Sequence, residues 1–265
     1  MDSLLPSVLN RFGLARRGVL HVGANEGQEA DLYNDLGFER VFWIEADPDI
    51  FPRLLGTLRS FPSQTAYCAL LADKDGEAIP FYVSNNNGGS SSLLPFNKKK
   101  MAELFPGLDV QQEKVLSTER LESFIARHQI QVGSFNVLNI DVQGAELLVL
   151  KGAGDLLLGL DLICLEVRLA RDYIGSSLLH EVDLYLIPEG FRRVRTSALG
   201  AEGEAYYLNV RRHLHLLEKA GMVLGSLALE LSYQAGITSF FVRRKRAFPF
   251  IAALYHKFLD VDSRT

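Results

Sequence analysis

Short apolar runs alternate with segments of helical spacing along most of the chain. The apolar runs are nearly continuous, which is typical of strands that are covered on both faces of a sheet. They comprise residues 19–22, 41–44, 66–70, 135–140 and 162–165. Helical spacing marks the intervening segments 28–36, 48–59, 119–128 and 145–151. This order predicts right-handed crossovers and a mostly parallel sheet with helices on both faces.

The two ends of the chain depart from this alternation. The extended runs 192–196 and 205–211 follow the last predicted parallel strand and are typical of a terminal antiparallel pair. We therefore expect an α/β domain over residues 19–212, preceded by a helical lead-in at 1–18 and followed by a helical extension at 213–265.

The extension carries a basic cluster at 243–246, followed by an apolar stretch of helical spacing that ends at Leu259. One interpretation is that this stretch packs against the domain or against a second copy of the chain in a homo-oligomer. The other is an interfacial helix, residues 243–259, that is attracted to anionic lipid. We favour packing, because apolar stripes usually meet protein partners.

The composition is that of an ordinary soluble globular protein. The 265 residues include 28 Lys and Arg against 32 Asp and Glu, and 48% of them are hydrophobic. A core of this size needs no disulfide or metal to stabilise it. The net charge of -4 argues against wide binding to a phosphate backbone, so we expect no nucleic-acid partner.

The sequence shows no signal for secretion or for membrane insertion. Residues 1–18 lack an apolar run followed by a cleavage site, and every apolar stretch is shorter than the roughly 18 to 20 residues of a membrane span. Cys68 and Cys164 lie in apolar runs and are expected to be buried thiols in a reducing compartment. These features predict a cytoplasmic protein without a transmembrane segment.

The candidate chemistry lies where the predicted strands end. The first strand ends in His21-Val-Gly-Ala-Asn-Glu-Gly27, whose two glycines allow a sharp turn close to a ligand. The spacing lacks the third glycine of the dinucleotide fingerprint. The second strand ends at Glu45, about 20 residues later, where a carboxylate accepts hydrogen bonds from both ribose hydroxyls. The alternative for Glu45 is a charge that favours the next helix N-terminus.

The fourth strand also ends in polar residues, with Asp141 at the ligand edge of the sheet and a helix starting beyond it. Asp141 has the alternative role of capping that helix. However, Asn25, Glu45 and Asp141 come from three strand ends that meet at one crevice. This convergence predicts a site for a nucleoside-type cofactor.

Several ordered segments resemble the FkbM family of S-adenosylmethionine-dependent methyltransferases. The resemblance covers about residues 18–212, and the 140–153 segment is its most specific part. It is carried by Gly-Ala-Asn-Glu-Gly-Gln at 23–28, Glu-Ala-Asp-Pro at 45–48, Ala69-Leu70 with 73–76 and Phe81, Gly-Ser-Ser-Ser-Leu at 89–93, Ile-Asp-Val-Gln-Gly-Ala-Glu-Leu at 140–147 and Val-Leu-Lys-Gly-Ala at 149–153.

The resemblance implies a Rossmann-like seven-stranded sheet of the methyltransferase type, with S-adenosylmethionine as cofactor. The cofactor-binding residues it implies are His21, Gly23, Ala24, Asn25, Gly27, Glu45, Ala46, Cys68, Ala69 and Asp141. The chain departs from the family at His21, where the loop commonly begins with an acidic residue. Neutral imidazole accepts a hydrogen bond, whereas protonated imidazole repels the cofactor's cationic groups, so we expect weaker cofactor binding at acid pH. The alternative is that His21 is only a packed strand residue.

Methyl transfer to a hydroxyl requires alignment of donor and acceptor and removal of a proton. The candidate bases, in order of preference, are Asp141, Glu166 and His180. Their alternative roles are a helix cap, a salt bridge to Arg168 and a solvated helical residue, respectively. Asp141 and Glu166 also have the oxygen ligands that a divalent cation such as Mg²⁺ prefers, whereas no spacing of His or Cys indicates a transition metal.

The acceptor is expected to be a small hydroxylated molecule. Family resemblance implies O-methylation of a sugar, glycan or polyketide-type hydroxyl. Ser91 and Ser92, in the polar loop 84–92, and Gln143 are the candidate acceptor-binding residues, although such loops are usually solvated turns.

Two other functions use the same sheet. A nicotinamide-dependent oxidoreductase would place its cofactor at Glu45, but it should show the third glycine and a hydride-site pair, which this sequence does not show convincingly. A non-catalytic nucleoside-binding module is the other alternative, since a fold does not imply activity.

Overall fold

The computed structural model describes residues 4–199 and 201–213, and its centre is a seven-stranded sheet of order β3-β2-β1-β7-β8-β10-β9. Neighbouring strands from β3 to β8 in this order are parallel, while β10 is antiparallel to both β8 and β9. The mostly parallel sheet and its terminal antiparallel pair are confirmed. The strands are β1 (Gly18–Val22), β2 (Arg40–Glu45), β3 (Gln64–Cys68), β7 (Val137–Ile140), β8 (Leu162–Arg168), β9 (Phe191–Leu199) and β10 (Glu202–Asn209).

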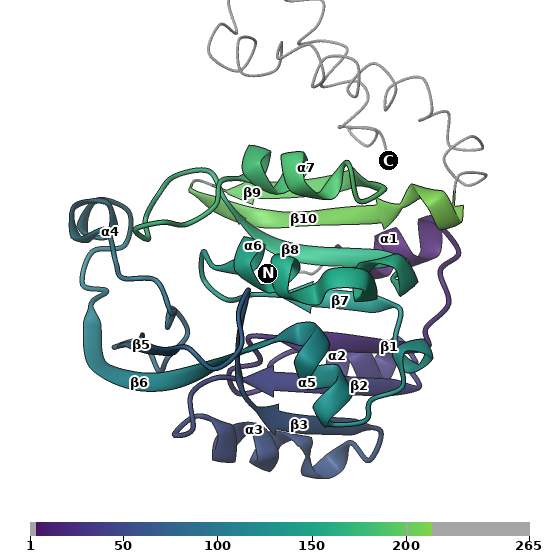
Figure 1. Ribbon diagram of the computed structural model, residues 1–265, viewed down its shortest axis with the longest axis horizontal. Coiled ribbons are helices and arrows are strands. Elements are labelled where there is room, and N and C mark those ends of the chain that lie inside the picture. The colour runs from purple at the N-terminus through teal and green to yellow at the C-terminus, as the bar shows by residue number, and fades with distance from the viewer. Residues whose placement is uncertain (1–3, 200, 214–265) are drawn as a thin grey trace, which may run out of the picture.

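Helices cover both faces of this sheet (Figure 1). They pack on both sides because alternate strand residues present apolar side chains to each face. One core contains Leu20, Val22 and Ile44, and the other contains Val19 and Trp43. The first core is closed by α5 (Leu121–Arg127), α6 (Glu146–Ala153) and α7 (Leu179–Leu186). The second is closed by α1 (Leu5–Arg11), α2 (Ala30–Asp35) and α3 (Phe51–Thr57).

A second, three-stranded sheet of order β4-β6-β5 was not expected from the sequence. It consists of β4 (Leu70–Ala72), β5 (Ala78–Ser84) and β6 (Val110–Arg120), with α4 (Lys98–Leu104) between β5 and β6. The predicted strand 66–70 is therefore wrong in its extent, because the chain leaves the main sheet after Cys68 and enters the small sheet at Leu70. β6 carries mostly exposed polar side chains, so no buried run marks it.

The small sheet lies at the end of the main sheet toward which the parallel strands point (Figure 1). Lys114 of β6 forms ion pairs with Asp47 and Asp49, which follow β2. The carboxyl ends of the central strands are thus faced by a separate layer, at the edge where ligands of such sheets bind.

Cys164 is buried, but Cys68 is exposed at the end of β3, so the expectation that both thiols are buried is wrong for Cys68. Residues 214–265 of the expected extension 213–265, including the membrane or packing stretch 243–259, lie outside the described residues. In the described part of the chain, no helix is long and apolar enough to cross a membrane.

Candidate active site

A cavity of about 310 Å³ lies at the carboxyl ends of β1, β2 and β7. β1 is the strand at which the order of the sheet reverses, so the cavity occupies the topological switch point. Its polar lining comes from the three predicted strand ends, and its apolar lining comes from the start of the small sheet. The lining residues are His21, Val22, Gly23, Asn25, Gln28, Glu29, Ile44, Glu45, Ala46, Ala69, Leu70, Leu71, Phe81, Gly88, Gly89, Ser91, Leu93, Asp141, Val142 and Gln143.

Gly23 allows the two central loops to approach each other. Its φ is +88°, and a Cβ at this position would lie 1.7 Å from the carbonyl oxygen of Asp141, so any other residue would push the β1 and β7 loops apart. Gly27 has a different role, because its missing Cβ leaves room for Leu54 of α3 at 2.9 Å and it does not line the cavity.

Glu45 holds the loops after β1 and β2 together. Its carboxylate accepts hydrogen bonds from the backbone N–H of Asn25 and of Asp47, each at 2.7 Å. Burial raises the pKa of Glu45 to about 7, although the two N–H donors act in the opposite direction. Asn25 itself adopts φ +44°, a left-handed conformation that is uncommon outside glycine and recurs at functional sites.

His21 is a buried residue whose side chain is held by protein partners. It is 3% exposed, its Nδ1 lies 3.0 Å from the Tyr33 hydroxyl, and its ring stacks on Trp43 with centroids 4.6 Å apart. Burial lowers the pKa of His21 to about 4. The imidazole is therefore neutral near pH 7, and protonation of His21 cannot weaken cofactor binding until the pH falls toward 4.

Asp141 and Glu166 are joined by the side chain of Gln143. The Nε2 of Gln143 donates to Asp141 Oδ1 at 2.7 Å and to Glu166 Oε2 at 2.8 Å. Its Oε1 accepts from Arg168 Nη2 at 2.7 Å and lies 3.0 Å from the Tyr173 hydroxyl. The single hydrogen of the Tyr173 hydroxyl is also within reach of the Ser90 carbonyl oxygen, at 2.9 Å. Protein groups therefore occupy both donor hydrogens of Gln143 and at least one of its two acceptor positions.

Arg168 anchors this network from within the core. Its guanidinium, on a residue 1% exposed, pairs with Glu166 at 2.6 Å, Asp172 at 2.9 Å and Glu202 at 2.6 Å. The salt bridge between Glu166 and Arg168 that was the alternative role for Glu166 is thus present. Burial, followed by the negative charge of Asp141, still holds the pKa of Glu166 well above its usual range.

A second cavity, of about 730 Å³, lies on the other side of Gln143 and Gly89. One part of its wall is polar and the other, from α4 and the loop that follows it, is apolar. It is lined by Asn85, Asn86, Gly89, Ser90, Met101, Phe105, Pro106, Gly107, Leu108, Gln143, Glu166, Arg168, Tyr173 and Glu202.

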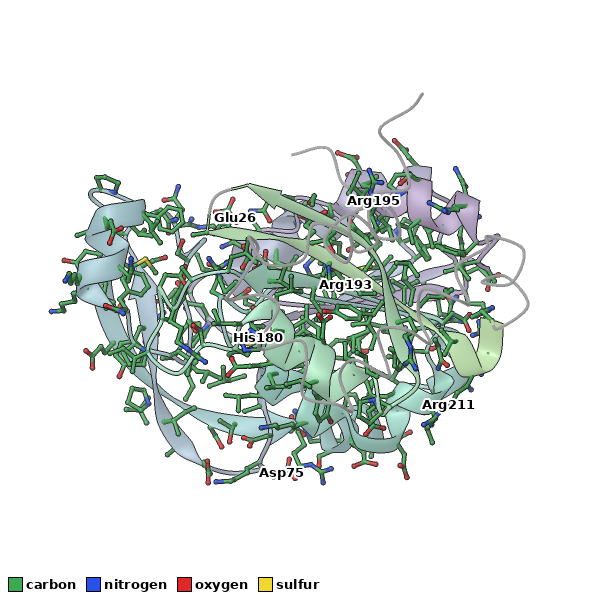
Figure 2. All side chains as sticks on the ribbon, turned by 90° about the horizontal axis from the view of Figure 1, so that it is seen from above. Glu26, Asp75, His180, Arg193, Arg195 and Arg211 are labelled. Atoms are coloured by element: carbon green, nitrogen blue, oxygen red, sulfur yellow. The ribbon has the colours of Figure 1, made fainter. Side chains whose placement is uncertain are left out.

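Four of the remaining sequence candidates do not line the first cavity, namely Ala24, Cys68, Ser92 and His180. Ala24, Cys68 and Ser92 flank it without lining it, and the Ser92 hydroxyl binds its own loop through Leu94 N at 3.0 Å. Ser91 does line the first cavity. His180 is exposed on α7 (Figure 2). It lines neither cavity, so the structure does not bring it to the other candidate bases.

The helix-cap alternative for Asp141 is not what the structure shows. The N-cap of α6 is Ala145, and no side chain caps it. Asp141 instead accepts from Gln143 at the mouth of the first cavity. Among the described residues there is no group of three or more His, Cys, Asp or Glu side chains that could hold a metal ion, so the magnesium alternative gains no support.

Sequence reasoning missed four residues of this region, namely Glu29, Glu146, Arg168 and Tyr173, as site residues. Arg168 and Tyr173 come from β8 and the loop after it, whose relation to the β7 end depends on tertiary packing. A signal existed for Glu146, which follows Gly144 by two residues, because a carboxylate there can accept backbone N–H groups of the loop. It accepts from Gly144 N at 2.9 Å and from Val142 N at 3.3 Å.

The buried carboxyl of Glu146 should make stability depend on pH. Burial raises its pKa to about 7 in the folded protein, against an ordinary value of 4.5. The folded state therefore holds a proton that the unfolded state has lost, and the free energy of unfolding should fall as pH rises from about 4.5 to about 7. Wild type should lose on the order of 1 to 3 kcal/mol relative to Glu146→Gln between pH 5 and pH 8.

Urea denaturation of both proteins at the two pH values measures this difference. Glu39→Gln, at an exposed position before β2, is the control and should track wild type. Parallel pH profiles for wild type and Glu146→Gln would contradict the assigned pKa.

The strand order and a cavity at the switch point define the class of protein: a Rossmann-like α/β protein of the S-adenosylmethionine-dependent methyltransferase type. The family model of the FkbM methyltransferase domain matches residues 21–193, which is more than half of the chain. The chain belongs to this family of methyltransferases. No curated protein matches the sequence.

The solved structures that match the chain are distant from it in sequence and have TM-scores below 0.5. Fibrillarin of Aeropyrum pernix with bound S-adenosyl-L-methionine is 14% identical, with 78% of this chain and 75% of that chain covered and a TM-score of 0.44. A SAM-dependent methyltransferase of Aquifex aeolicus is 16% identical, with 79% and 94% covered and a TM-score of 0.42. The ribosomal protein L11 methylase of Lactobacillus delbrueckii subsp. bulgaricus is 11% identical, with 78% and 76% covered and a TM-score of 0.43.

Proposed function

We propose that this protein transfers a methyl group from S-adenosylmethionine to a hydroxyl of a small molecule, of the sugar, glycan or polyketide type. The observation that carries the proposal is the pair of cavities that share Gln143 and Gly89. A methyl transferase must hold two ligands so that the donor carbon faces the acceptor atom. Two adjoining cavities at the ligand edge of the sheet meet this requirement.

The lining of the first cavity fits the cofactor in charge and polarity. Its ionisable side chains, within the described residues, are Glu29, Glu45, Asp141 and the neutral His21, and no Lys or Arg lines it. S-adenosylmethionine carries a sulfonium and an ammonium group, and carboxylates favour both cations. In this proposal Glu45 binds the ribose, and the apolar residues Leu71 and Phe81 lie beside the adenine.

Asp141 is the first choice for the general base, which removes the proton of the substrate hydroxyl. It lies at the edge between the cavities and is tied by a hydrogen bond to Gln143. Glu166 is the second choice, because it lines the second cavity but is paired with Arg168. S-adenosylmethionine, when bound, supplies an electrophilic methyl group, and these residues would position the acceptor and remove its proton.

The second cavity is the proposed acceptor site. Its polar wall, with Asn85, Asn86 and Ser90, offers hydrogen bonds to hydroxyl groups. Its opposite wall, with Met101 and Phe105, suits an apolar part of the same molecule.

The lining argues against the nicotinamide alternative. A dinucleotide carries a pyrophosphate, and a cavity with three carboxylates and no cation among its described lining residues disfavours such an anion. A non-catalytic binding module has the same cavity but transfers no methyl group. Titration calorimetry with S-adenosylhomocysteine and with NAD, followed by a search for a mass gain of one methyl group in a panel of hydroxylated acceptors, separates the three functions.

Replacing Glu45 by Ala should lower the affinity for S-adenosylhomocysteine by one to two decades. The substitution removes charge-assisted hydrogen bonds to the ribose, worth about 1.5 to 3 kcal/mol, and also releases the loop N–H groups of Asn25 and Asp47. Calorimetry measures the change, with Glu39→Ala as a control of equal charge change outside the cavity. An unchanged dissociation constant in folded Glu45→Ala protein would show that Glu45 does not bind the cofactor.

A further inference from the structure

The wall of the second cavity carries more negative than positive charge. Among the described residues that line it, Arg168 is the one cation, and its guanidinium pairs with Glu166 at 2.6 Å and with Glu202 at 2.6 Å. It also pairs at 2.9 Å with Asp172, which is fully buried and does not line the cavity. The lysines at 98–100 on α4 do not line it either. One guanidinium therefore faces three carboxylates, and its single charge does not balance them.

Two observations show that this excess negative charge is not cancelled within the described part of the protein. The Oδ1 atom of the fully buried Asp172 has no hydrogen-bond partner there. Burial, followed by the negative charge of Asp141, holds the pKa of Glu166 well above its usual range, and Glu202 acts in the same direction against Arg168. A cation in the second cavity would stabilise this cluster, whereas an anion would add to the repulsion.

Glu202 is the carboxylate of this cluster that a ligand reaches most easily. Its side chain is 30% exposed, against 17% for Glu166 and 0% for Asp172. Its Oε2 accepts from Arg168 Nη1 at 2.6 Å, while its Oε1 receives no hydrogen bond from residues 4–199 and 201–213. A ligand can therefore bind Oε1 without breaking the ion pair that holds the side chain at the cavity wall.

The position of Glu202 relative to Gln143 indicates how an acceptor would lie. Nη1 of Arg168 binds Glu202, and Nη2 of the same guanidinium binds Gln143 Oε1 at 2.7 Å. Gln143 lines both cavities, so a methyl donor in the first cavity would meet an acceptor in the second cavity beside it. A cationic group at Glu202 and a hydroxyl at Gln143 would thus lie at the two ends of one guanidinium, a separation that a sugar ring or a short amino alcohol spans.

An ammonium group matches this wall in charge and in hydrogen bonding. It has three N–H donors, and its hydrogen bonds to carboxylates are stronger than those between neutral groups. A divalent cation matches less well, because the described residues contain no group of three or more His, Cys, Asp or Glu side chains that could hold a metal ion.

We propose that the acceptor carries a protonated amine, as amino sugars and amino alcohols do, and that Glu202 binds this amine while the reacting hydroxyl lies at Gln143. The inference rests on the proposed function, because it takes the second cavity as the acceptor site. The apolar wall at Met101 and Phe105 receives the rest of the molecule. The same charge disfavours anionic acceptors such as sugar phosphates.

The test is titration calorimetry at pH 7 with the full chain and saturating S-adenosylhomocysteine. Two probes that combine an aromatic part with an amino alcohol are used, phenyl β-D-glucosaminide and 2-amino-1-phenylpropane-1,3-diol. Each is compared with its N-acetyl form and with the form that has a hydroxyl in place of the amine. In at least one series, the free amine should bind wild type about tenfold more tightly than both neutral forms. Glu202→Gln can still accept from Arg168, but it should weaken binding of that amine about tenfold and change binding of the neutral forms less than about twofold.

The control variant is Glu103→Gln, which removes the same charge from an exposed position on α4 that does not line the cavity. It should bind all probes as wild type does. No preference of wild type for the amine in either series overturns the proposal, and so does a preference that persists in Glu202→Gln. Equal losses for the amine and the neutral forms also overturn it, because Glu202 would then support the cavity and not the amine.

A failure of the proposed function gives a different result. Wild type that does not bind S-adenosylhomocysteine contradicts the proposed function itself. Wild type that binds S-adenosylhomocysteine without preferring the amines contradicts only the assignment of Glu202.

Discussion

Turnover is expected to fall by about 10²-fold or more when Asp141 is replaced by Asn, while the protein still binds S-adenosylhomocysteine. Asn preserves the shape of the side chain and can still accept the hydrogen bond that Gln143 donates to Asp141 Oδ1. Asn lacks the negative charge and the basicity that are needed to remove the proton of the substrate hydroxyl. The expected loss therefore lies mainly in the rate of transfer, and the loss of cofactor affinity, from one carboxylate of the cavity lining, should be smaller. Steady-state kinetics with any acceptor found in the panel, together with calorimetry, measures both quantities.

The control for this variant is Asp155→Asn, at an exposed position after α6 that lines neither cavity. Its turnover should equal that of wild type. Near-normal turnover of Asp141→Asn would exclude Asp141 as the base and shift the role to Glu166. If the turnover of Asp141→Asn falls as expected, adding Mg²⁺ or a chelator to wild type distinguishes the two possible roles of Asp141. Only a role as metal ligand, and not one as proton acceptor, makes the rate depend on the ion.

The main sheet could be predicted because its strands are buried on both faces. Runs such as 19–22 and 162–165 have no polar face, and so they stand out from the helices between them. The small sheet could not be predicted in this way. β6 exposes most of its side chains, and its pairing with β4 and β5 is fixed by contacts that no local pattern records.

The first cavity could be predicted for a topological reason. Parallel strands end at one edge, so polar residues after β1, β2 and β7 had to meet there. The network around Gln143 depends instead on Arg168 and Tyr173, which approach from a different strand and from the loop after it. The alternation of strands and helices gives no information about which side chains from these elements meet. The sequence therefore offered Gln143 as an acceptor-binding residue without indicating that both of its donor hydrogens bind Asp141 and Glu166.

Replacing Arg168 by Met should destabilise the protein by about 3 to 5 kcal/mol, the largest stability effect that the structure predicts. The residue is 1% exposed, and its guanidinium pairs with Glu166, Asp172 and Glu202. It also lies over the ring of Tyr173, 5.2 Å from the centroid. Met fills much of the same volume, but it leaves the fully buried Asp172 and the largely buried Glu166 without their cation. The cost is that of unpaired buried charges rather than of a lost surface contact.

Urea denaturation of Arg168→Met, wild type and Arg53→Met measures this cost. Arg53 pairs with Glu26 at 2.8 Å, but both side chains are exposed, so its loss should cost about 0 to 1 kcal/mol. The Arg168→Met deficit should shrink at pH 5, because protonation relieves the uncompensated carboxylates. A deficit no larger than that of Arg53→Met would mean that the three carboxylates do not depend on Arg168. In that case the Arg168 guanidinium would not be the group that holds Gln143 between Asp141 and Glu166. Another interaction would have to fix the position of Gln143 between the two cavities.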